Sequence, residues 1–467
     1  MKKLLVFCLA AVLMLCPCSV SAAETEEDVS ITSGCNTLNG NITYLGSQPL
    51  FDSCASVILY EATTDTLMYA YNADDQLQPA SLVKIMTALI AIEKGNLSDK
   101  VTVKADVLDT IPVDAMIVGL YRDEVLTVED LLHCMMVASG NDAAAVLADY
   151  IMGSQEAFVA EMNRFAAELG CTNTNFTNVH GLSDRDQYAS VRDMARILSY
   201  AIQNETFKEV YGALYYTVPE TNKFVARFLT NENYLLNTEN VVGHYDPRVT
   251  GSRTGIAEDR TRCISATAEQ NGMVYISVIM GAESIYEDDG YSTKYYGGYA
   301  EHKKLLDLGM EGYKSAQVLF ENQVLLQKPV LNGDSDIFIG PHTSADSVIP
   351  SSMLSQDLSY HYLNEVTLIA PIEKGQKLST VQIWCGSVCI AQADLFAMNS
   401  VKEASQLSVN NQTAGGNGFW KVLLYVLGAV FGIVGVIFIP LVLLRTIRIT
   451  KVKNQRRRNR RYRRRSR

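Results

Sequence analysis

Residues 78–89 read QPASLVKIMTAL, and Ser81 in this stretch is the one serine of the chain that has a lysine, Lys84, three positions later. Apolar residues follow at intervals of three and four from Leu82 onward, which predicts a helix with one buried face. Residues three positions apart project from the same side of a helix. The spacing therefore predicts that Ser81 and Lys84 meet at the first turn.

A pair of this kind can carry out nucleophilic chemistry. A serine hydroxyl attacks poorly unless a base removes its proton, and a lysine can be that base when burial and nearby positive charge keep it neutral. Between Ser81 and Ala91, Lys84 is the only charged residue. Backbone N–H groups at the start of the helix can also stabilise an oxyanion. The alternative is an ordinary helix cap followed by a surface lysine.

Two later segments carry further polar groups. Ser139-Gly140-Asn141 separates two predicted helices, at 127–138 and from 143 onward, and such a turn can present a hydroxyl and an amide to a cleft. A plain connection between helices is the alternative for this segment. Residues 249–255 are predicted as a strand that ends in Arg253-Thr254-Gly255. Further strands are predicted at 55–60, 66–71, 263–267 and 274–280, and further helices at 156–169, 190–203 and 301–309.

Charge is distributed unevenly along the chain. The sequence has 40 Lys and Arg and 51 Asp and Glu residues, but the Arg-rich end after Leu444 contains no acid. The part before it is therefore strongly acidic, which argues against nucleic acid as its partner. At 467 residues, the chain is long enough for more than one domain.

Both ends of the sequence carry membrane signals. Residues 1–22 have the basic start, apolar run and small-residue end of a secretory signal peptide, with an uncleaved anchor as the alternative. Residues 421–444 are predicted to form one transmembrane helix, since Val422–Leu444 contain no charge and are long enough to span a bilayer. The basic tail 445–467 favours the cytoplasmic side. We expect a single-pass cell-membrane protein whose acidic part faces outward.

Composition divides the region between these ends. Residues 23–50 are a polar spacer, and residues 51–313 have the pattern of an α/β (α+β) domain with a helical subdomain. Short strands at 314–404 predict a small all-β domain, and the Gly- and Asn-rich residues 405–420 predict a flexible stalk. The cysteine spacings match no zinc pattern.

The three polar motifs together resemble a known set. Their order, S-x-x-K, then S-x-N, then a basic residue followed by Thr-Gly, is that of penicillin-binding proteins and class A β-lactamases. Residues 79–87, 136–143 and 174–182 resemble one branch, the low-molecular-mass penicillin-binding proteins that are D-alanyl-D-alanine carboxypeptidases. Residues 370–376 are similar to the C-terminal β domain of that branch. The resemblance implies a penicillin-binding/β-lactamase-like fold for residues 51–313, followed by the β domain.

The resemblance also implies an activity. It implies a serine peptidase that removes the terminal D-Ala from peptidoglycan stem peptides ending in D-Ala-D-Ala, that β-lactams inhibit covalently, and that needs no cofactor or metal. Ser81 would be the nucleophile, Lys84 the base and Ser139 the proton relay. Substrate binding would fall to Asn141 at the peptide amide, to the N–H of Ile256 beside that of Ser81 in the oxyanion hole, and to the third motif, Arg253, Thr254 and Gly255, at the terminal carboxylate.

One position departs from the family pattern. The family usually has lysine where this chain has Arg253, which keeps the charge and can grip a carboxylate with two hydrogen bonds. A β-lactamase shares the three motifs but would need a deacylating Glu, and a transpeptidase would pass the acyl group to an amine. A paralogue that only binds wall peptide is the non-enzymatic alternative, against which the intact Ser81, Lys84 and Ser139 argue.

Overall fold

The computed structural model describes residues 38, 48–231, 233–239, 243–288, 293–354, 357–363 and 367–404. Internal contacts divide these residues into two units. The first unit comprises the described residues of Met1–Gln323, Pro341–Glu365 and Ser379–Leu395. The second comprises those of Val324–Gly340, Val366–Leu378 and Phe396–Arg467.

An antiparallel sheet of five strands forms the centre of the first unit, in the order β2-β1-β9-β8-β7. The turn between β8 and β9 is the short polar one that the sequence predicts. Asn271 and Gly272 there have φ values of 54° and 78°, the left-handed conformation that a two-residue hairpin requires. β7 lies at the edge of the sheet. The strands are β1 (Cys54–Glu61), β2 (Thr66–Tyr71), β7 (Val249–Ile256), β8 (Arg262–Gln270) and β9 (Met273–Ala282).

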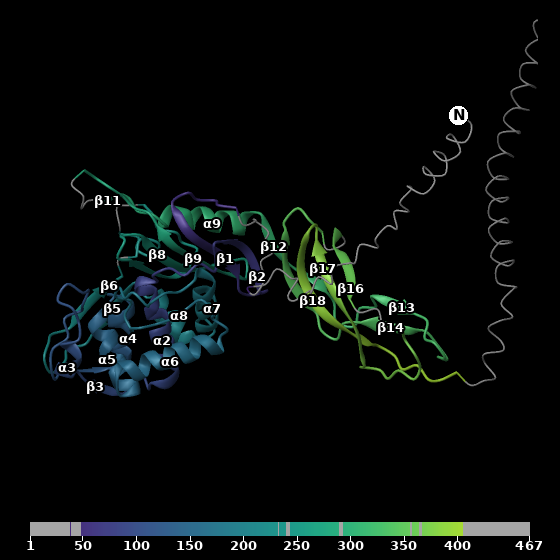
Figure 1. The fold of residues 1–467 in the computed structure, drawn as a ribbon, viewed down its shortest axis with the longest axis horizontal. Helices are drawn as coiled ribbons and strands as arrows, with labels where there is room; N and C mark the ends of the chain where they lie inside the picture. Colours follow the sequence, from purple (N-terminus) through teal and green to yellow (C-terminus); the bar gives the residue numbers. More distant parts are fainter. Residues whose placement is uncertain are drawn as a thin grey trace, which may run out of the picture. The chain divides into compact units, whose positions relative to one another are not determined.

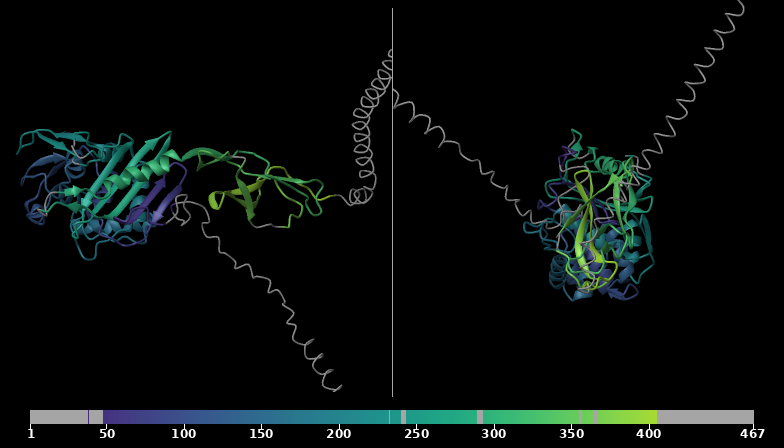
Figure 2. Two further views of the ribbon diagram at one scale, coloured as in Figure 1. Left: turned by 90° about the horizontal axis from the view of Figure 1, so that it is seen from above. Right: turned by 90° about the vertical axis from the view of Figure 1, so that its right-hand side faces the viewer.

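Helices cover both faces of this sheet (Figures 1 and 2). On one face α9 (Tyr299–Glu311) packs on β1, β8 and β9, and on the other α7 (Val191–Ala201) packs on β1 and β9. Alternate residues of β1 therefore enter different cores. Val57 and Leu59 lie in the core beneath α9, whereas Ile58 and Tyr60 join the helical core. The unbroken apolar run of this strand follows from burial on both faces.

The remaining helices and three pairs of short strands complete the described part of this domain. α4 begins with a capping box between Thr127 and Asp130, which confirms the predicted helix start. α8 and these strand pairs were not predicted from the sequence. The elements are α2 (Val83–Lys94), α3 (Ala105–Leu108), α4 (Val128–Met136), α5 (Asn141–Met152), α6 (Gln155–Glu168), α8 (Glu205–Gly212), and the paired strands β3 (Lys100–Thr102) with β4 (Val125–Thr127), β5 (Tyr215–Val218) with β6 (Arg227–Thr230), and β10 (Ile285–Tyr286) with β11 (Thr293–Tyr295).

The helix that follows the S-x-x-K motif differs from the prediction in one respect. A single buried face was expected, but every residue of α2 from Val83 to Ala91 is buried. The reason is that α4, α5, α7 and α8 surround it. A helix enclosed by others is usually apolar on all sides. Lys84 is an exception, because it places an ionisable amine in this apolar core.

Beyond the first domain the described chain is all β. In the first unit β12 (Tyr313–Leu319) pairs with β15 (Ala345–Pro350), and β16 (Ser359–Leu363) pairs with β17 (Lys377–Cys385) beside β18 (Val388–Ala397). In the second unit β13 (Leu326–Lys328) pairs with β14 (Ile337–Gly340). An α/β domain followed by an all-β region is thus confirmed. Of the strand predicted at 365–369, residues 365 and 366 lie outside the described residues, and residues 367–369 belong to no named strand; β16 lies before them.

Several predicted segments fall outside the described residues. These are the signal peptide at 1–22, the stalk at 405–420, the transmembrane helix at 421–444 and the basic tail at 445–467. Within the described part of the chain, no helix has both the length and the hydropathy needed to cross a membrane.

Candidate active site

The serine of the first motif stands at a sharp turn of the chain. Ser81 is in the 3-10 turn η1 (Ala80–Leu82), which leads directly into α2. Ala80 before it has a φ of 47°, a left-handed conformation that is uncommon for a residue other than glycine. Lys84 Nζ lies 3.2 Å from Ser81 Oγ, so the two side chains meet as the spacing predicts.

The surroundings of Lys84 favour the neutral amine. Its side chain is fully buried, and its pKa is well below the ordinary value, first because of burial and then because of the positive charge of Arg253, while Asp142 opposes the shift. Lys84 Nζ donates to Asn141 Oδ1 and to the carbonyl of His180, both at 2.6 Å. A neutral amine has two N–H groups and one lone pair. These two acceptors take both N–H groups, which leaves the lone pair for the Ser81 hydroxyl.

The second motif lies on the other side of this pair. Ser139 occupies the turn between α4 and α5 with a φ of 60°, and Asn141 is the first residue of α5. Because Asn141 Oδ1 accepts from Lys84, the motif joins the S-x-x-K pair through a direct contact. Ser139 Oγ accepts from Arg253 Nη2, which connects it to the third motif.

Arg253 is buried in the wall of the site. Only 4% of its surface is exposed, and burial lowers its pKa to about 10. Its Nη1 donates to the carbonyl of Met136 at 2.8 Å, its Nε to the carbonyl of Ser81 at 3.4 Å, and its Nη2 to Ser139 Oγ. The guanidinium therefore bonds to both other motifs.

Two glycines allow the segments to approach the nucleophile. A Cβ on Gly255 of β7 would lie 2.5 Å from the backbone nitrogen of Ser81. A Cβ on Gly181, whose φ is 88°, would lie 2.0 Å from the carbonyl oxygen of Ala80. Both contacts are too close for any side chain, so only glycine fits. The end of β7 and the loop 180–183 thus lie directly against the turn that holds Ser81.

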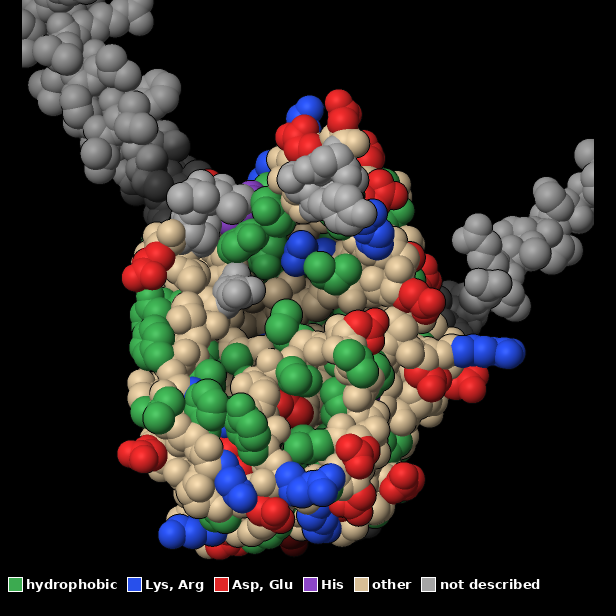
Figure 3. Space-filling view, turned by 90° about the vertical axis from the view of Figure 1, so that its left-hand side faces the viewer, with side chains coloured by type: hydrophobic (Ala, Val, Ile, Leu, Met, Phe, Trp, Pro, Cys, Tyr) green, Lys and Arg blue, Asp and Glu red, His purple; other side chains and the backbone are tan. Residues whose placement is uncertain are grey.

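These residues line a cleft of about 720 Å³ at the edge of the sheet. All the predicted site residues line it except Lys84, which lies buried beneath Ser81. The rim carries exposed apolar side chains, including Met116, Ile117 and Ile256. Figure 3 shows the face that carries α3, β5 and β6, where a hollow is bordered by hydrophobic side chains. A cleft of this size suits a short peptide with apolar side chains.

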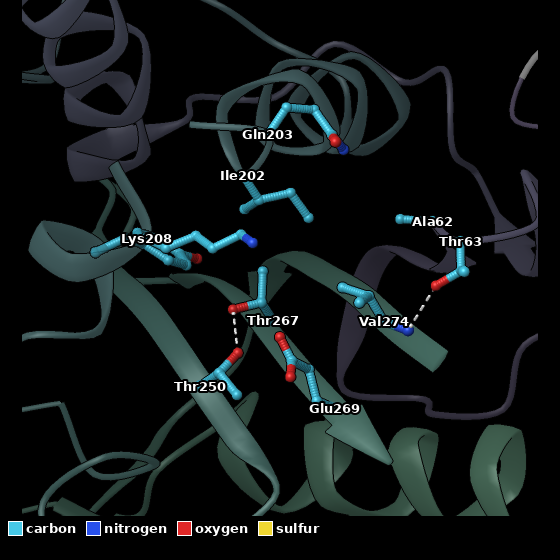
Figure 4. A pocket seen from close by; sticks show the side chains of 10 residues that line it. Ala62, Thr63, Ile202, Gln203, Lys208, Thr250, Thr267, Glu269 and Val274 are labelled. Carbon is cyan, nitrogen blue, oxygen red and sulfur yellow. Dashed lines mark hydrogen bonds between the residues drawn. The ribbon is translucent and has the colours of Figure 1, made fainter. Parts of the chain in front are cut away.

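A second, smaller pocket of about 350 Å³ lies between the ends of α7 and α8 and the strands β7, β8 and β9 (Figure 4). Lys208 and Glu269 reach its edge, and the hydroxyls of Thr250 and Thr267 bond to each other at 2.9 Å. Lys208 is engaged by Glu205 at 2.8 Å. None of the predicted site residues lines this pocket, so it is separate from the chemistry of the cleft.

Three further groups belong to the site although the motifs did not indicate them. The backbone carbonyl of His180 holds Lys84, and burial lowers the pKa of the His180 imidazole to about 3, so this ring is neutral. Asp142 accepts the backbone N–H groups of residues 118, 119 and 120, which form the cleft wall. Arg262 of β8 also lines the cleft. Arg262 could have been found from the sequence as a basic residue at the start of an otherwise apolar strand.

The fold and the site have close counterparts among known proteins. The sequence model of a family described as D-alanyl-D-alanine carboxypeptidase matches residues 46–284, and that of the penicillin-binding protein 5 C-terminal domain matches residues 313–403. The D-alanyl-D-alanine carboxypeptidase DacF of Bacillus subtilis (strain 168) is 30% identical over 371 residues, which is 77% of this chain and 89% of the relative. DacC of Escherichia coli (strain K12), which bears the same enzyme name, is 31% identical over 357 residues, which is 74% of this chain and 84% of the relative.

A solved structure shares the same architecture. Penicillin-binding protein 5 from Haemophilus influenzae superposes with a TM-score of 0.62 at 30% sequence identity, and the match covers 77% of this chain and all of that one. Family, fold and site therefore agree: the chain belongs to the D-alanyl-D-alanine carboxypeptidase family of penicillin-binding proteins and is a serine hydrolase of that class.

Proposed function

We propose that the protein cleaves the last peptide bond of peptidoglycan stem peptides that end in D-Ala-D-Ala, by way of an acyl-enzyme on Ser81. Ser81 Oγ attacks the carbonyl carbon of the penultimate D-Ala, and Lys84 Nζ takes the hydroxyl proton. The C–N bond then breaks, and Ser139 passes a proton to the leaving D-Ala amine. Water hydrolyses the ester and restores Ser81.

The walls of the cleft have matching roles in this proposal. The N–H groups of Ser81 and Ile256 stabilise the oxyanion, since Gly255 brings the end of β7 against the Ser81 backbone. Asn141 binds the substrate amide, and its Oδ1 also accepts the hydrogen bond from Lys84. The terminal carboxylate lies at the β7 side of the cleft, near Thr254.

The single observation that carries the proposal is the environment of Lys84. A lysine without a carboxylate partner, fully buried and held by two oxygen acceptors, is costly for stability. Its one remaining hydrogen-bond position faces the hydroxyl of Ser81, 3.2 Å away. This arrangement makes a proton acceptor for a nucleophile, and a purely peptide-binding protein has no need of it.

Labelled penicillin tests the nucleophile. We expect one covalent label, located on Ser81 by peptide mass spectrometry, because Ser81 Oγ should attack the strained lactam amide as it attacks the peptide. Ser81→Ala should lose the label, while the control Ser98→Ala, which changes an exposed serine, should keep it. A D-Ala-D-Ala peptide should release free D-Ala with wild type and Ser98→Ala only. Label on another residue, or release of D-Ala by Ser81→Ala, would contradict the assignment.

Hydrolysis of the peptide is favoured over β-lactamase activity. A β-lactamase of this type needs a Glu that activates water against the acyl-enzyme. Among the described residues that line the cleft, the one carboxyl side chain beyond the motifs is that of Asp114, which is exposed on the rim. The penicilloyl-enzyme should therefore persist far longer than the acyl-enzyme of the peptide, and the two lifetimes can be compared by mass spectrometry.

We also propose that the protein acts on the wall side of the cell membrane. The proposal rests on the signal-like residues 1–22, the uncharged run Val422–Leu444 and the basic tail after it. A protease added to intact protoplasts should then remove the catalytic domain and spare an epitope tag placed after Arg467. Loss of the tag together with survival of the catalytic domain would reverse this topology.

A further inference from the structure

The third motif presents its side chains to two different sides of the sheet. Consecutive residues of a strand point to opposite faces. Arg253 points toward η1 and α4, where it meets the carbonyls of Ser81 and Met136. Thr254 points the other way, where its Oγ1 lies 3.5 Å from Nη1 of Arg262. The two side chains that the motif pairs in sequence therefore do not face the same part of the cleft.

Arg253 has its donors engaged with the protein. All three of its nitrogens make hydrogen bonds to the walls of the site, and only 4% of the residue's surface is exposed. A carboxylate could reach this guanidinium only by displacing Ser139 or a backbone carbonyl. Displacing such an acceptor in a buried site is costly because the acceptor then lacks a donor.

Arg262 lies on the same face of the sheet as Thr254. In the ladder between β7 and β8, Ile264 is opposite Thr254, and Arg262 is two residues further along, which makes it the diagonal neighbour on that face. The Arg262 guanidinium lies 5.3 Å from the ring centre of Tyr299 and 5.8 Å from that of Tyr296. Arg262, Thr254 and Tyr299 all line the cleft. They form a small polar corner beside the catalytic serine.

Arg262 is buried, and no described residue supplies a counter-ion to it. Only 9% of its surface is exposed, and its Nε has no hydrogen-bond partner. Within the described part of the chain, no carboxylate lies within salt-bridge distance of it. A buried charge without a partner is costly, and proteins seldom keep one. An arginine placed this way in a cleft has the donors and geometry that suit a planar carboxylate.

We propose that Arg262 and Thr254 bind the terminal carboxylate of the substrate, and that Arg253 instead acts as a positioning residue for Ser139 and Lys84. The inference rests on the proposed function and deepens it, because it assigns the preference for a free C-terminus to a residue outside the three motifs. Arg262 supplies its Nη donors to the carboxylate, and Thr254, whose Oγ1 lies 3.5 Å from Arg262 Nη1, supplies its hydroxyl. Arg253 orients the Ser139 hydroxyl through their hydrogen bond, and its positive charge favours the neutral amine of Lys84.

The test compares a peptide ending in D-Ala-D-Ala as the free acid with the same peptide amidated at its C-terminus. Arg262→Ala should raise KM for the acid about 10- to 100-fold and change the reaction of the amide by less than about threefold. Arg262→Lys should recover part of the loss, since a point charge remains. Arg260→Ala removes an exposed arginine that stacks on Tyr286 near the same strand, and it should behave like wild type. Arg253→Gln should lower kcat for both peptides alike.

Each other result has a definite meaning. Equal losses of acid and amide cleavage in Arg262→Ala would overturn the inference, as would a loss selective for the acid in Arg253→Gln but not in Arg262→Ala. Cleavage of the amide serves as the internal check that a variant is folded. If wild type cleaves the acid and Arg262→Ala cleaves it equally well, the inference alone fails. If wild type cleaves neither peptide, the proposed function fails and the inference fails with it.

Discussion

Lys84 is the residue whose protonation should set the lower pH limit of activity. The Ser81 proton can move only to a neutral amine, and burial together with the charge of Arg253 keeps the Lys84 pKa well below its ordinary value of 10.5. Because the unfolded chain binds this proton more tightly, the contribution of Lys84 to stability is least at low pH. It rises as the pH increases from the folded pKa toward 10.5. The low pKa that makes Lys84 usable as a base thus lowers the free energy of unfolding below pH 10.5.

The first prediction concerns this pH limit. Removal of the neighbouring positive charge in Arg253→Gln should raise the Lys84 pKa, so the acid limb of kcat/KM for penicillin acylation should move to higher pH. The measurement is the second-order acylation rate across pH. His180→Asn is the matched control: the His180 pKa of about 3 lies below the range of the assay, and Asn can still accept the N–H of Leu182 that His180 Nδ1 accepts at 3.3 Å. An acid limb that stays in place in Arg253→Gln would show that Arg253 does not tune the base.

The second prediction concerns the close approach of β7 to the nucleophile. In Gly255→Ala the new methyl group would lie 2.5 Å from Ser81 N, and since both partners are backbone-anchored, the strand or the turn must shift. A shift near 1 Å at a reacting centre costs on the order of 100-fold in rate. We expect acylation by penicillin to slow by about that factor. Gly312→Ala, where the nearest atom would be 3.8 Å away, should acylate normally, and normal acylation in Gly255→Ala would disprove the requirement.

At the scale of elements, the cleft depends on a loop that α5 holds in place. Asp142 in the first turn of α5 accepts the backbone N–H groups of Val118, Gly119 and Leu120 at 3.0–3.1 Å. That loop supplies Met116 and Ile117 to the rim. One helix N-terminus therefore carries Asn141 toward Lys84 and, one residue later, the carboxyl group that anchors the opposite wall.

The third prediction follows from this anchor. Asp142→Ala would leave three buried or half-buried N–H groups without their acceptor, at a cost on the order of 3 kcal/mol in the free energy of unfolding. Urea denaturation should show this loss, and KM for the peptide should rise as the wall loosens. Asp142→Asn retains one oxygen acceptor and should lie between wild type and the alanine variant. If both variants unfold at the wild-type urea concentration, the loop has another support.

At the scale of the whole molecule, the site is assembled from segments that are far apart in the chain. In the proposed mechanism, the nucleophile and base come from η1 and α2, the relay from the turn between α4 and α5, and the groups that bind the oxyanion and the carboxylate from β7 and β8. All of these lie in the α/β domain, and no residue of the described β region lines the cleft. Catalysis and membrane attachment should therefore be separable.

The fourth prediction tests that separation. A chain that ends at Ala404, the last described residue, lacks the predicted stalk, transmembrane helix and basic tail. It should acylate with penicillin at the wild-type rate within about twofold and should appear in the soluble fraction, whereas the full chain sediments with membranes. A truncated chain that still sediments would place the membrane attachment elsewhere. Comparison with the full chain bearing Ser81→Ala separates sedimentation from activity.

Local patterns in the chain were sufficient for the three motifs, the capping box at Thr127, the hairpin at Asn271 and most strands of the central sheet. These features depend on spacing along the chain and on hydrogen bonds between near neighbours. The spacing also placed Ser81 beside Lys84. The positions of α8 and the three pairs of short strands were not accessible in this way, because these short segments are stabilised by packing against distant elements.

Only the tertiary structure determines which side chains of the motifs lie beside one another. Strand alternation and the pairing of β7 with β8 separate Arg253 from Thr254 and bring Arg262 beside Thr254 instead. The two acceptors that hold Lys84 come from residues 57 and 96 positions away in the chain. The burial of every α2 residue from Val83 to Ala91 arises in the same manner from surrounding helices. Such contacts join residues with no local relation, and only the packed tertiary structure can establish them.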